Sequence, residues 1–318
     1  MDIEYLLLLQ SLREKTAWLI PVLSKFCDLN VVLLPAVCLF LYLSIDKRTG
    51  FLSLLCFNVS EIANLLVKNV CCVYRPYIKD TRLTPPAKST SYSFPSGHTM
   101  YATSMYGVIG AWQQKRHKWI TALCIALILV TGFARNYLGV HTPQDVIVSV
   151  VLTLLCMLLC VKLAGHIEEH PEKRMPAVLI GAAVGIAVLV FLCVKPYPMD
   201  YDAEGKLLVD PYKTQTEVFQ CIGKWLGFLA GSVLDALVIR YEIPESKPVR
   251  YIGGTAGGLL CFIGAIVLRK IKTLPLGAHW GGLLVYFLFW FLMIAVIPMM
   301  IQKISEKARH TSPAFKDK

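Results

Sequence analysis

The chain has 318 residues, of which 56% are hydrophobic and only 17% charged, and it carries a formal net charge of +11. Ordinary soluble domains hold about 25% charged residues, so this composition excludes a typical soluble fold and indicates a membrane protein. The lysines and arginines fall in short clusters between apolar runs and not along one exposed face, which argues against nucleic acid as a partner.

The apolar runs predict an all-α fold, a polytopic membrane helix bundle. Residues 1–28 carry enough charge to predict an interfacial segment, and they lack the basic start and cleavage site of a removed signal peptide. Residues 29–165 then form a transmembrane core, 175–303 a C-terminal transmembrane extension, and 304–318 a basic tail. A span needs about 20 apolar residues, and nine such runs are predicted, at 30–45, 51–72, 98–113, 119–138, 145–164, 175–194, 218–239, 251–268 and 281–301.

Three short polar clusters at the ends of core helices supply the parts of a phosphoryl-transfer site. They are Lys68 with Arg75 and Pro76, then Pro95-Ser96-Gly97-His98, then Arg135 with His141 and Asp145. Phosphoryl transfer depends on preorganised positive charge around an anionic centre, which these residue types provide. Because the chain crosses the bilayer twice between His98 and Arg135, all three clusters are expected on the same side of the membrane.

The segment His141-Thr142-Pro143-Gln144-Asp145 has the pattern of a helix start, with Thr142 as the N-cap and Pro143 in the first turn. Asp145 has two interpretations that can coexist. It completes a capping box, or it accepts a proton from one nitrogen of His141 and so fixes the tautomer whose other nitrogen faces a phosphorus atom.

The other clusters also have two interpretations each. Ser96 and Gly97 either open an ordinary helix or present free amide N–H groups to an anion at the positive end of the helix dipole. Lys68, Arg75 and Arg135 are either membrane-flanking charges that reach the interface or cations that bind phosphate oxygens.

Taken together, Lys-x6-Arg-Pro, Pro-Ser-Gly-His and Arg-x5-His-x3-Asp resemble the three-part signature of the type 2 phosphatidic acid phosphatase superfamily, which includes the vanadium haloperoxidases. The resemblance covers roughly residues 50–165. It implies that His141 is the nucleophile, forming a phosphohistidine, that Asp145 orients it, and that His98 protonates the leaving group. It also implies that the phosphate is held by five residues, Lys68, Arg75, Ser96, Gly97 and Arg135, and that no metal or other cofactor is needed.

The chain departs from the family pattern at two places. Ala134 stands before Arg135 where the family usually has serine, so one hydroxyl contact to phosphate is missing. Two clear spans precede the first motif, where membrane members commonly have three.

A polar stripe runs along the predicted helix at 51–72. Asn58, Glu61, Asn64 and Lys68 recur at spacings of three or four and so share one face, which in lipid normally points into the bundle. Glu61 either neutralises Lys68 from below or makes a helix contact unrelated to the site. A polar loop at 195–216 is expected on the same side as the three clusters, as a lid or as a plain loop.

Two further patterns carry little weight. The eleven cysteines form no spaced framework and are interpreted as small core residues. The sequence from His166 to His170 fits a metallopeptidase pattern, but it has no third ligand and lies on the opposite membrane face.

The expected function is that of a membrane phosphatase acting on a lipid phosphate monoester or diphosphate. Its partners are then a phosphorylated lipid and the membrane. Basic loops on the opposite side place the site on the extracytoplasmic face of a cell membrane, although Lys79, Arg82, Lys88, Arg269, Lys270 and Lys272 on the motif side weaken that argument. The alternatives are a vanadate-dependent haloperoxidase and a non-catalytic transporter or scaffold.

Overall fold

The computed structural model describes residues 2–271 and 276–311, so Met1, Lys272 and the last seven residues of the predicted basic tail lie outside the described residues. Within this part the fold is all-α, and an isolated bridge between Tyr201 and Leu207 is its one extended pairing. The predicted fold class is therefore confirmed.

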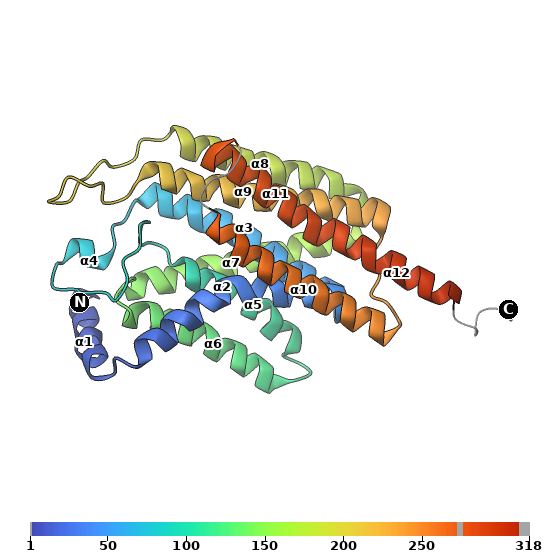
Figure 1. The fold of residues 1–318 in the computed structure, drawn as a ribbon, viewed down its shortest axis with the longest axis horizontal. Coiled ribbons are helices and arrows are strands. Elements are labelled where there is room, and N and C mark those ends of the chain that lie inside the picture. The colour runs from blue at the N-terminus through green and yellow to red at the C-terminus, as the bar shows by residue number, and fades with distance from the viewer. Residues whose placement is uncertain (1, 272–275, 312–318) are drawn as a thin grey trace.

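The N-terminal part of the bundle consists of seven helices (Figure 1). They are α1 (Asp2–Lys15), α2 (Leu19–Ser44), α3 (Lys47–Cys71), the short α4 (Pro76–Lys79), α5 (Gly97–Gln113), α6 (Lys118–Tyr137) and α7 (Pro143–Glu169).

The C-terminal part adds α8 (Arg174–Val194), α9 (Pro211–Leu234), α10 (Lys247–Lys270), α11 (Gly282–Phe291) and α12 (Ile297–Thr311). Short turns of 3-10 or π-helix continue these helices at Pro171–Lys173, Asp235–Ile239, Gly277–Gly281 and Leu292–Val296. This part corresponds to the four spans predicted after residue 175.

Eight helical stretches among the described residues are long and apolar enough to cross a membrane. The remaining predicted span, at 98–113, corresponds to α5, which has 17 residues and is shorter than a typical span of about 20. Many large apolar side chains on the outer helices are exposed, such as Leu129, Leu158 and Ile180. In a bilayer these side chains face lipid.

The first long helix begins at Leu19, well before the predicted start of the first span at residue 30. The sequence pattern was broken there by Lys25 and Asp28, but both side chains are exposed, so the helix accommodates them without burying charge. The separate helix α1 is short and packs Leu6 and Leu9 against the end of α6, with Arg13 Nη1 donating to the Tyr137 carbonyl at 2.9 Å.

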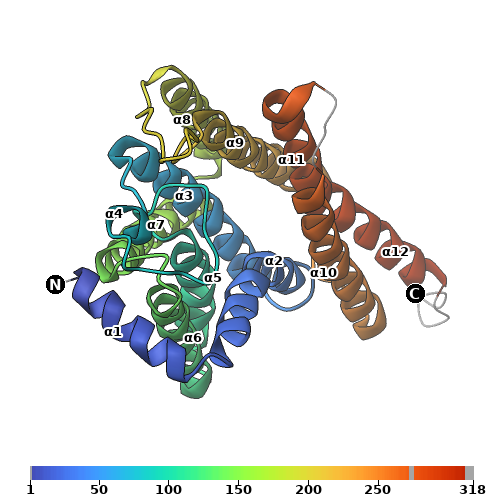
Figure 2. The ribbon, with the colours of Figure 1, turned by 60° about the vertical axis from the view of Figure 1, so that its left-hand side comes forward.

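The C-terminal part contacts the core through α10, which lies against α2, and through α8 and α9, which lie against α3. Within the C-terminal part, α9 lies against α8, and α11 packs along α9 (Figure 2). The ends of the helices that carry the three polar clusters meet at the left of Figure 1, together with the loop that precedes α9.

Helices α9 and α11 approach each other closely. A Cβ atom added at Gly223 or Gly227 would collide with the backbone carbonyl of Leu283 or Phe287, respectively. The two glycines therefore let the helices approach backbone to backbone, a packing mode common in membranes.

We predict that Gly227→Ala destabilises the protein by about 1–3 kcal/mol, because the new methyl group forces α9 and α11 apart. Gly165→Ala is the matched control: its Cβ meets nothing within 4 Å, and alanine is favoured over glycine inside a helix by about 1 kcal/mol. Thermal unfolding in detergent compares the two variants with the wild type. Equal transition temperatures for the two variants would contradict the packing argument.

Candidate active site

Six of the eight predicted site residues line one cavity of about 440 Å³: Lys68, Arg75, Gly97, His98, Arg135 and His141. They come from the end of α3, the start of α4, the start of α5, the end of α6 and the loop before α7. Ser96 and Asp145 are not among the lining residues and lie behind them. The structure thus brings the three sequence clusters to a single place.

The His141 imidazole is held from both sides. Its Nδ1 lies 3.3 Å from Asp145 Oδ2, and Arg75 Nη1 lies 2.8 Å from its Nε2. A guanidinium group only donates hydrogen bonds, so Nε2 is the acceptor and Nδ1 carries the proton that faces Asp145. The arrangement therefore fixes the tautomer with an unprotonated Nε2 facing the cavity.

The surroundings of His141 also keep the ring neutral. Burial lowers the pKa of His141 well below its usual value of 6.5, and the positive charges of Arg75, Arg135 and Lys68 lower it further. The side chain is only 2% exposed. A neutral imidazole beside three cations is a nucleophile or a base, and not a cation that binds an anion.

Asp145 performs both tasks between which the sequence could not decide. It completes the capping box: the Thr142 hydroxyl accepts from the Asp145 amide at 3.3 Å, and Asp145 Oδ2 accepts from the Thr142 amide at 2.8 Å. The same oxygen faces His141 and accepts from the Ser93 hydroxyl at 2.5 Å. The helix start and the orientation of His141 therefore depend on one carboxylate.

The Pro-Ser-Gly-His segment forms the start of α5, as predicted. Ser96 is the N-cap and accepts from the Thr99 amide at 3.5 Å, while its own amide donates to the Asp145 carbonyl at 3.0 Å. With both its hydroxyl and its amide engaged inside the protein, Ser96 holds α5 against α7. Its predicted contact to phosphate stays a prediction. A Cβ atom added at Gly97 would meet nothing within 4 Å, so the backbone there borders open space.

His98 faces the cavity and a carboxylate that the sequence analysis did not identify. Its Nε2 lies 3.5 Å from Asp28 Oδ1 of α2, and the two side chains are 24% and 60% exposed. His98 is thus the more accessible of the two imidazoles, but burial still lowers the pKa of His98 to about 4, and the Asp28 carboxylate opposes this shift only in part.

The three cations are buried, and two of them, Lys68 and Arg135, keep hydrogen-bonding capacity. Lys68 Nζ donates to the carbonyls of Tyr92 at 3.1 Å and Pro95 at 2.8 Å, which leaves one of its three protons. Arg135 Nε has no hydrogen-bond partner within the described part of the chain. Both side chains line the cavity, where an oxyanion would satisfy these donors.

Arg75 is positioned by a serine-rich loop that the sequence analysis overlooked. Its Nη2 donates to the hydroxyls of Ser89 and Ser91 at 3.1 Å each, and its Nε donates to the Ser91 carbonyl at 2.9 Å. The run of Ser89, Ser91 and Ser93 directly before the Pro-Ser-Gly-His segment was the available signal.

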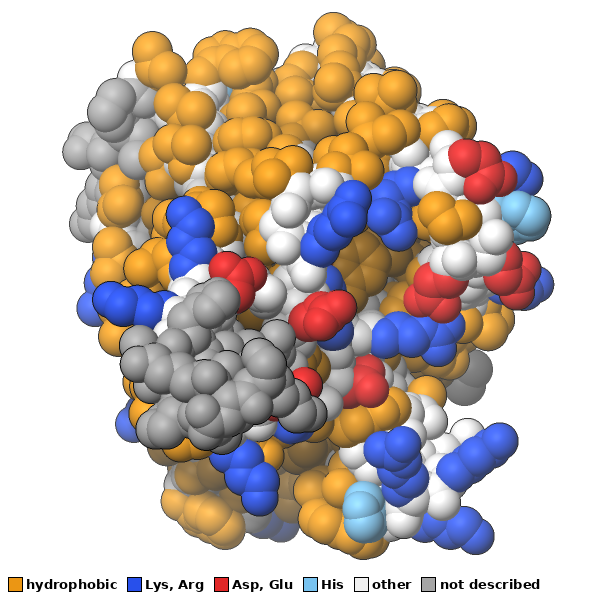
Figure 3. All heavy atoms as spheres, turned by 90° about the vertical axis from the view of Figure 1, so that its right-hand side faces the viewer, with side chains coloured by type: hydrophobic (Ala, Val, Ile, Leu, Met, Phe, Trp, Pro, Cys, Tyr) orange, Lys and Arg blue, Asp and Glu red, His pale blue; other side chains and the backbone are white. Residues whose placement is uncertain are grey.

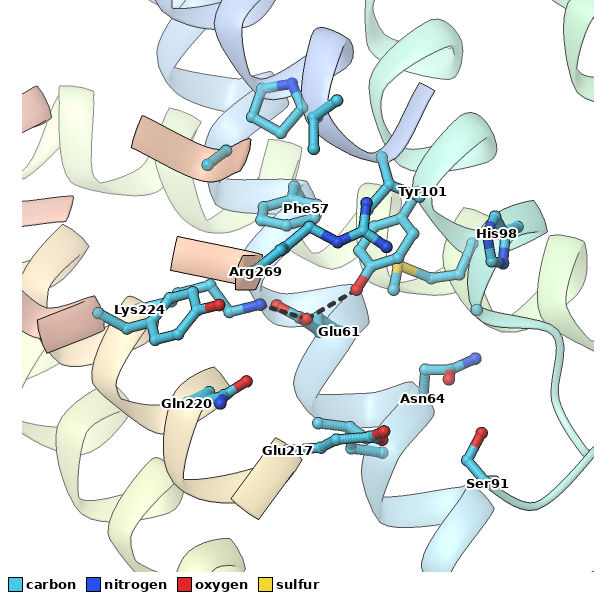
Figure 4. Close-up of a pocket in the computed structure, with 18 of the residues that line it drawn as sticks. Phe57, Glu61, Asn64, Ser91, His98, Tyr101, Glu217, Gln220, Lys224 and Arg269 are labelled. Carbon is cyan, nitrogen blue, oxygen red and sulfur yellow. Dashed lines mark hydrogen bonds and ion pairs between the residues drawn. The ribbon is translucent and has the colours of Figure 1, made fainter. Parts of the chain in front are cut away.

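The suggestion that Glu61 neutralises Lys68 is wrong. Glu61 Oε1 forms an ion pair with Lys224 of α9 and accepts from the Tyr101 hydroxyl at 2.9 Å (Figure 4). The alternative interpretation, in which Glu61 makes a polar contact with another helix, is confirmed as far as the contact itself is concerned. However, Glu61 and Lys224 line the same cavity as Lys68, so this contact is not remote from the site.

Among the described residues, no group of three or more His, Cys, Asp and Glu side chains is placed to hold a metal ion. His166 and His170 stack with ring centroids 4.7 Å apart, far along α7 from the cavity.

Comparison with known proteins agrees with this geometry. Residues 49–167 match the profile of the PAP2 superfamily. An undecaprenyl-diphosphatase of Sulfolobus acidocaldarius is 30% identical over 132 residues, which are 41% of this chain and 62% of the relative. Phosphatidylglycerophosphatase B of Bacillus subtilis is 34% identical over 105 residues, 31% of this chain and 49% of the relative.

The match to these curated relatives is partial, since the chain spans between about half and 62% of their length. A crystal structure of a transmembrane PAP2-type phosphatidylglycerolphosphate phosphatase from Bacillus subtilis is 27% identical, with a TM-score of 0.39, and covers 47% of this chain and 78% of that one.

We predict that the cavity binds inorganic phosphate and that Arg135→Gln weakens this binding by about 10- to 100-fold, the usual effect of losing a hydrogen bond to a charged group. The shift of the unfolding temperature with phosphate concentration gives the affinity. Arg116→Gln, in an exposed turn outside the cavity, is the control and should bind like the wild type. Equal affinity in both variants would count against Arg135 as a phosphate ligand.

Proposed function

We propose that the chain, whose residues 49–167 match the profile of the PAP2 superfamily, is an integral membrane phosphatase that hydrolyses a lipid phosphate monoester or diphosphate. The observation that carries the proposal is the unprotonated His141 Nε2, which faces a cavity that also holds Lys68, Arg75, Arg135 and His98. The relatives named above include enzymes for a diphosphate and for a monoester, so both substrate types remain within the proposal.

In the first step, His141 Nε2 attacks the phosphorus atom while the bond from phosphorus to the leaving oxygen breaks. Arg75, which caps Nε2 in the absence of substrate, then donates to a phosphate oxygen instead. Lys68 and Arg135 contribute further positive charge to the transition state. The product is a phosphohistidine, and Asp145 stabilises the positive ring by accepting from its Nδ1–H.

His98 acts as the general acid in this step. It transfers a proton to the leaving oxygen, so that the lipid departs as an alcohol or as a lipid monophosphate. In the second step a water molecule loses a proton to His98 and attacks phosphorus, the bond to His141 Nε2 breaks, and inorganic phosphate is released. Protons and charge balance over the two steps without a metal ion.

We propose a cell-membrane location with the cavity on the extracytoplasmic side. The end of the bundle remote from the cavity carries gathered charged side chains, whereas its flanks are apolar (Figure 3). Loops at that end hold Lys47, Arg48, Lys115, Arg116, Lys173 and Arg174, in keeping with the positive-inside rule. On the cavity side, the Tyr74 hydroxyl donates to Asp200 at 2.6 Å, which ties the loop before α9 to the same end of the molecule.

We predict that purified protein releases phosphate from a short-chain lipid phosphate, that EDTA leaves the rate unchanged, and that vanadate inhibits it. His141→Ala should reduce kcat/KM by at least about 10³-fold, because it removes the nucleophile. His117→Ala, at an exposed helix start, is the control with wild-type activity. Bromide oxidation with vanadate and peroxide, in place of phosphate release, would favour the haloperoxidase alternative. Neither bromide oxidation nor phosphate release would favour the non-catalytic transporter or scaffold.

The lowered pKa of His141 gives a second prediction. Burial is the main cause of the lowered pKa of His141, and the charge of Arg75 is the next. Arg75→Gln should therefore raise the pKa of His141 toward 6.5 and move the acid limb of kcat/KM to higher pH. Arg75→Lys keeps the charge and should leave the limb near its wild-type position. All variants are compared with the same substrate, so that the titration of the substrate phosphate affects every pH profile equally. A limb that moves to lower pH in Arg75→Gln would refute the assigned state of His141.

A further inference from the structure

The cavity extends beyond the phosphate-binding end, along a polar wall formed by α3 and α9 (Figure 4). Helix α3 contributes Glu61 and Asn64, and α9 contributes Glu217, Gln220 and Lys224. Of these groups, only the Glu61–Lys224 pair is an ion pair within the described part of the chain.

The two helices present their polar groups at the same spacing. Glu61, Asn64 and Lys68 lie three and four residues apart on α3, and Glu217, Gln220 and Lys224 lie three and four residues apart on α9. Residues at these spacings share one helix face. The two helices run in opposite directions. Glu217 therefore lies near Lys68, at the phosphate-binding end of the cavity, and Lys224 lies further into the bundle, where it contacts Glu61.

Several polar atoms of this wall lack a partner. Glu61 Oε2 and Asn64 Nδ2 have no hydrogen bond among the described residues, although the two residues are only 5% and 3% exposed. Glu217, which is exposed, and Gln220, which is half-buried, also line the cavity, with their side chains directed into it. Leaving the buried atoms of Glu61 and Asn64 unpaired costs free energy, so this wall indicates a polar ligand.

The other lining residues are mostly apolar, among them Val31, Val32 and Pro35 of α2, Leu268 of α10 and Trp290 of α11. Arg269 of α10 is the charged exception among them. A lipid phosphate fits this division, with its phosphate at His141, its chain along α2 and α10, and the polar group beside the phosphate against α3 and α9.

We propose that the α3–α9 wall is a subsite for the hydroxyl-bearing headgroup of the lipid phosphate, an assignment that rests on the proposed function. The polar atoms along this wall include the acceptors of Glu61 and Glu217, the donor of Asn64, and the amide of Gln220, which both donates and accepts. Hydroxyl groups both donate and accept and so match this mixture. An ammonium group would leave Asn64 Nδ2 unpaired, and a second phosphate would face the Glu217 carboxylate.

The subsite gives the C-terminal extension a part in substrate choice. Glu217, Gln220 and Lys224 all belong to α9, outside the segment that matches the PAP2 profile. The core segment holds the phosphate, whereas the extension supplies half of the polar wall beside it. Sites that bind a hydroxyl group discriminate strongly against analogues that lack it.

The test compares 1-oleoyl-glycerol 3-phosphate with its 2-deoxy analogue, which lacks the free hydroxyl group next to the phosphorylated carbon. The full-length protein in detergent should show a kcat/KM at least 10-fold higher for the hydroxylated substrate. Glu217→Leu should reduce this ratio at least fivefold, and Glu217→Gln, which keeps an acceptor, should reduce it less. Glu169→Gln, at the exposed end of α7, is the matched control with the wild-type ratio. Each variant's hydrolysis of the deoxy analogue shows that the variant is folded.

A wild-type ratio within twofold of unity would overturn the subsite, and so would a Glu217→Leu variant that loses activity on both substrates in equal proportion. Preference for an amine in place of the hydroxyl group would assign the wall to an amino headgroup and overturn this proposal. Failure of the wild type to hydrolyse either substrate would instead refute the proposed function on which the subsite rests.

Discussion

Buried positive charge is the constraint on which the rest of this structure depends. Lys68, Arg75 and Arg135 are all less than one-tenth exposed, and such charges are tolerated only when they are paired or hydrogen-bonded. Lys68 binds the carbonyls of Tyr92 and Pro95, and Arg75 binds those of Ser91 and Val140. The cations that would hold a phosphate group therefore also order the two loops that carry His98 and His141, so site and loop structure form together.

The same constraint joins the extension to the core. Glu61 would be an uncompensated carboxylate inside the bundle if Lys224 of α9 did not reach it, and breaking a buried pair is far more costly than omitting both partners. At the other end of the bundle, Asp235 pairs with Lys47 at 2.7 Å and accepts from the Tyr42 hydroxyl at 2.8 Å. With one ion pair midway along α3 and α9 and a second at the end remote from the cavity, the extension is part of the same folded unit as the core.

The sequence predicts those structural features that depend on residues close together along the chain. The capping box at Thr142 and Asp145 spans four residues, and the common side of the three clusters follows from counting crossings, so both were predictable. The partner of Glu61 lies 163 residues away on α9, and Asp28 meets His98 across two helices. The spacing of polar residues shows which face of each helix is polar, but it does not show which helices meet, because that depends on how they pack. The early start of α2 was missed because exposure of Lys25 and Asp28 cannot be read from hydropathy.

The two imidazoles differ in the burial of their carboxylate partners, and this difference fits the two proposed roles. His141 and Asp145 have side chains only 2% and 3% exposed, and the buried carboxylate fixes one tautomer while nearby cations oppose protonation. His98 is 24% exposed and faces Asp28, whose side chain is 60% exposed. A nucleophile needs a fixed lone pair, whereas an acid that later acts as a base needs access to solvent. The start of α7 at Pro143 fixes the lone pair of His141, and the exposed Asp28 on α2 gives His98 a neighbour that reaches solvent.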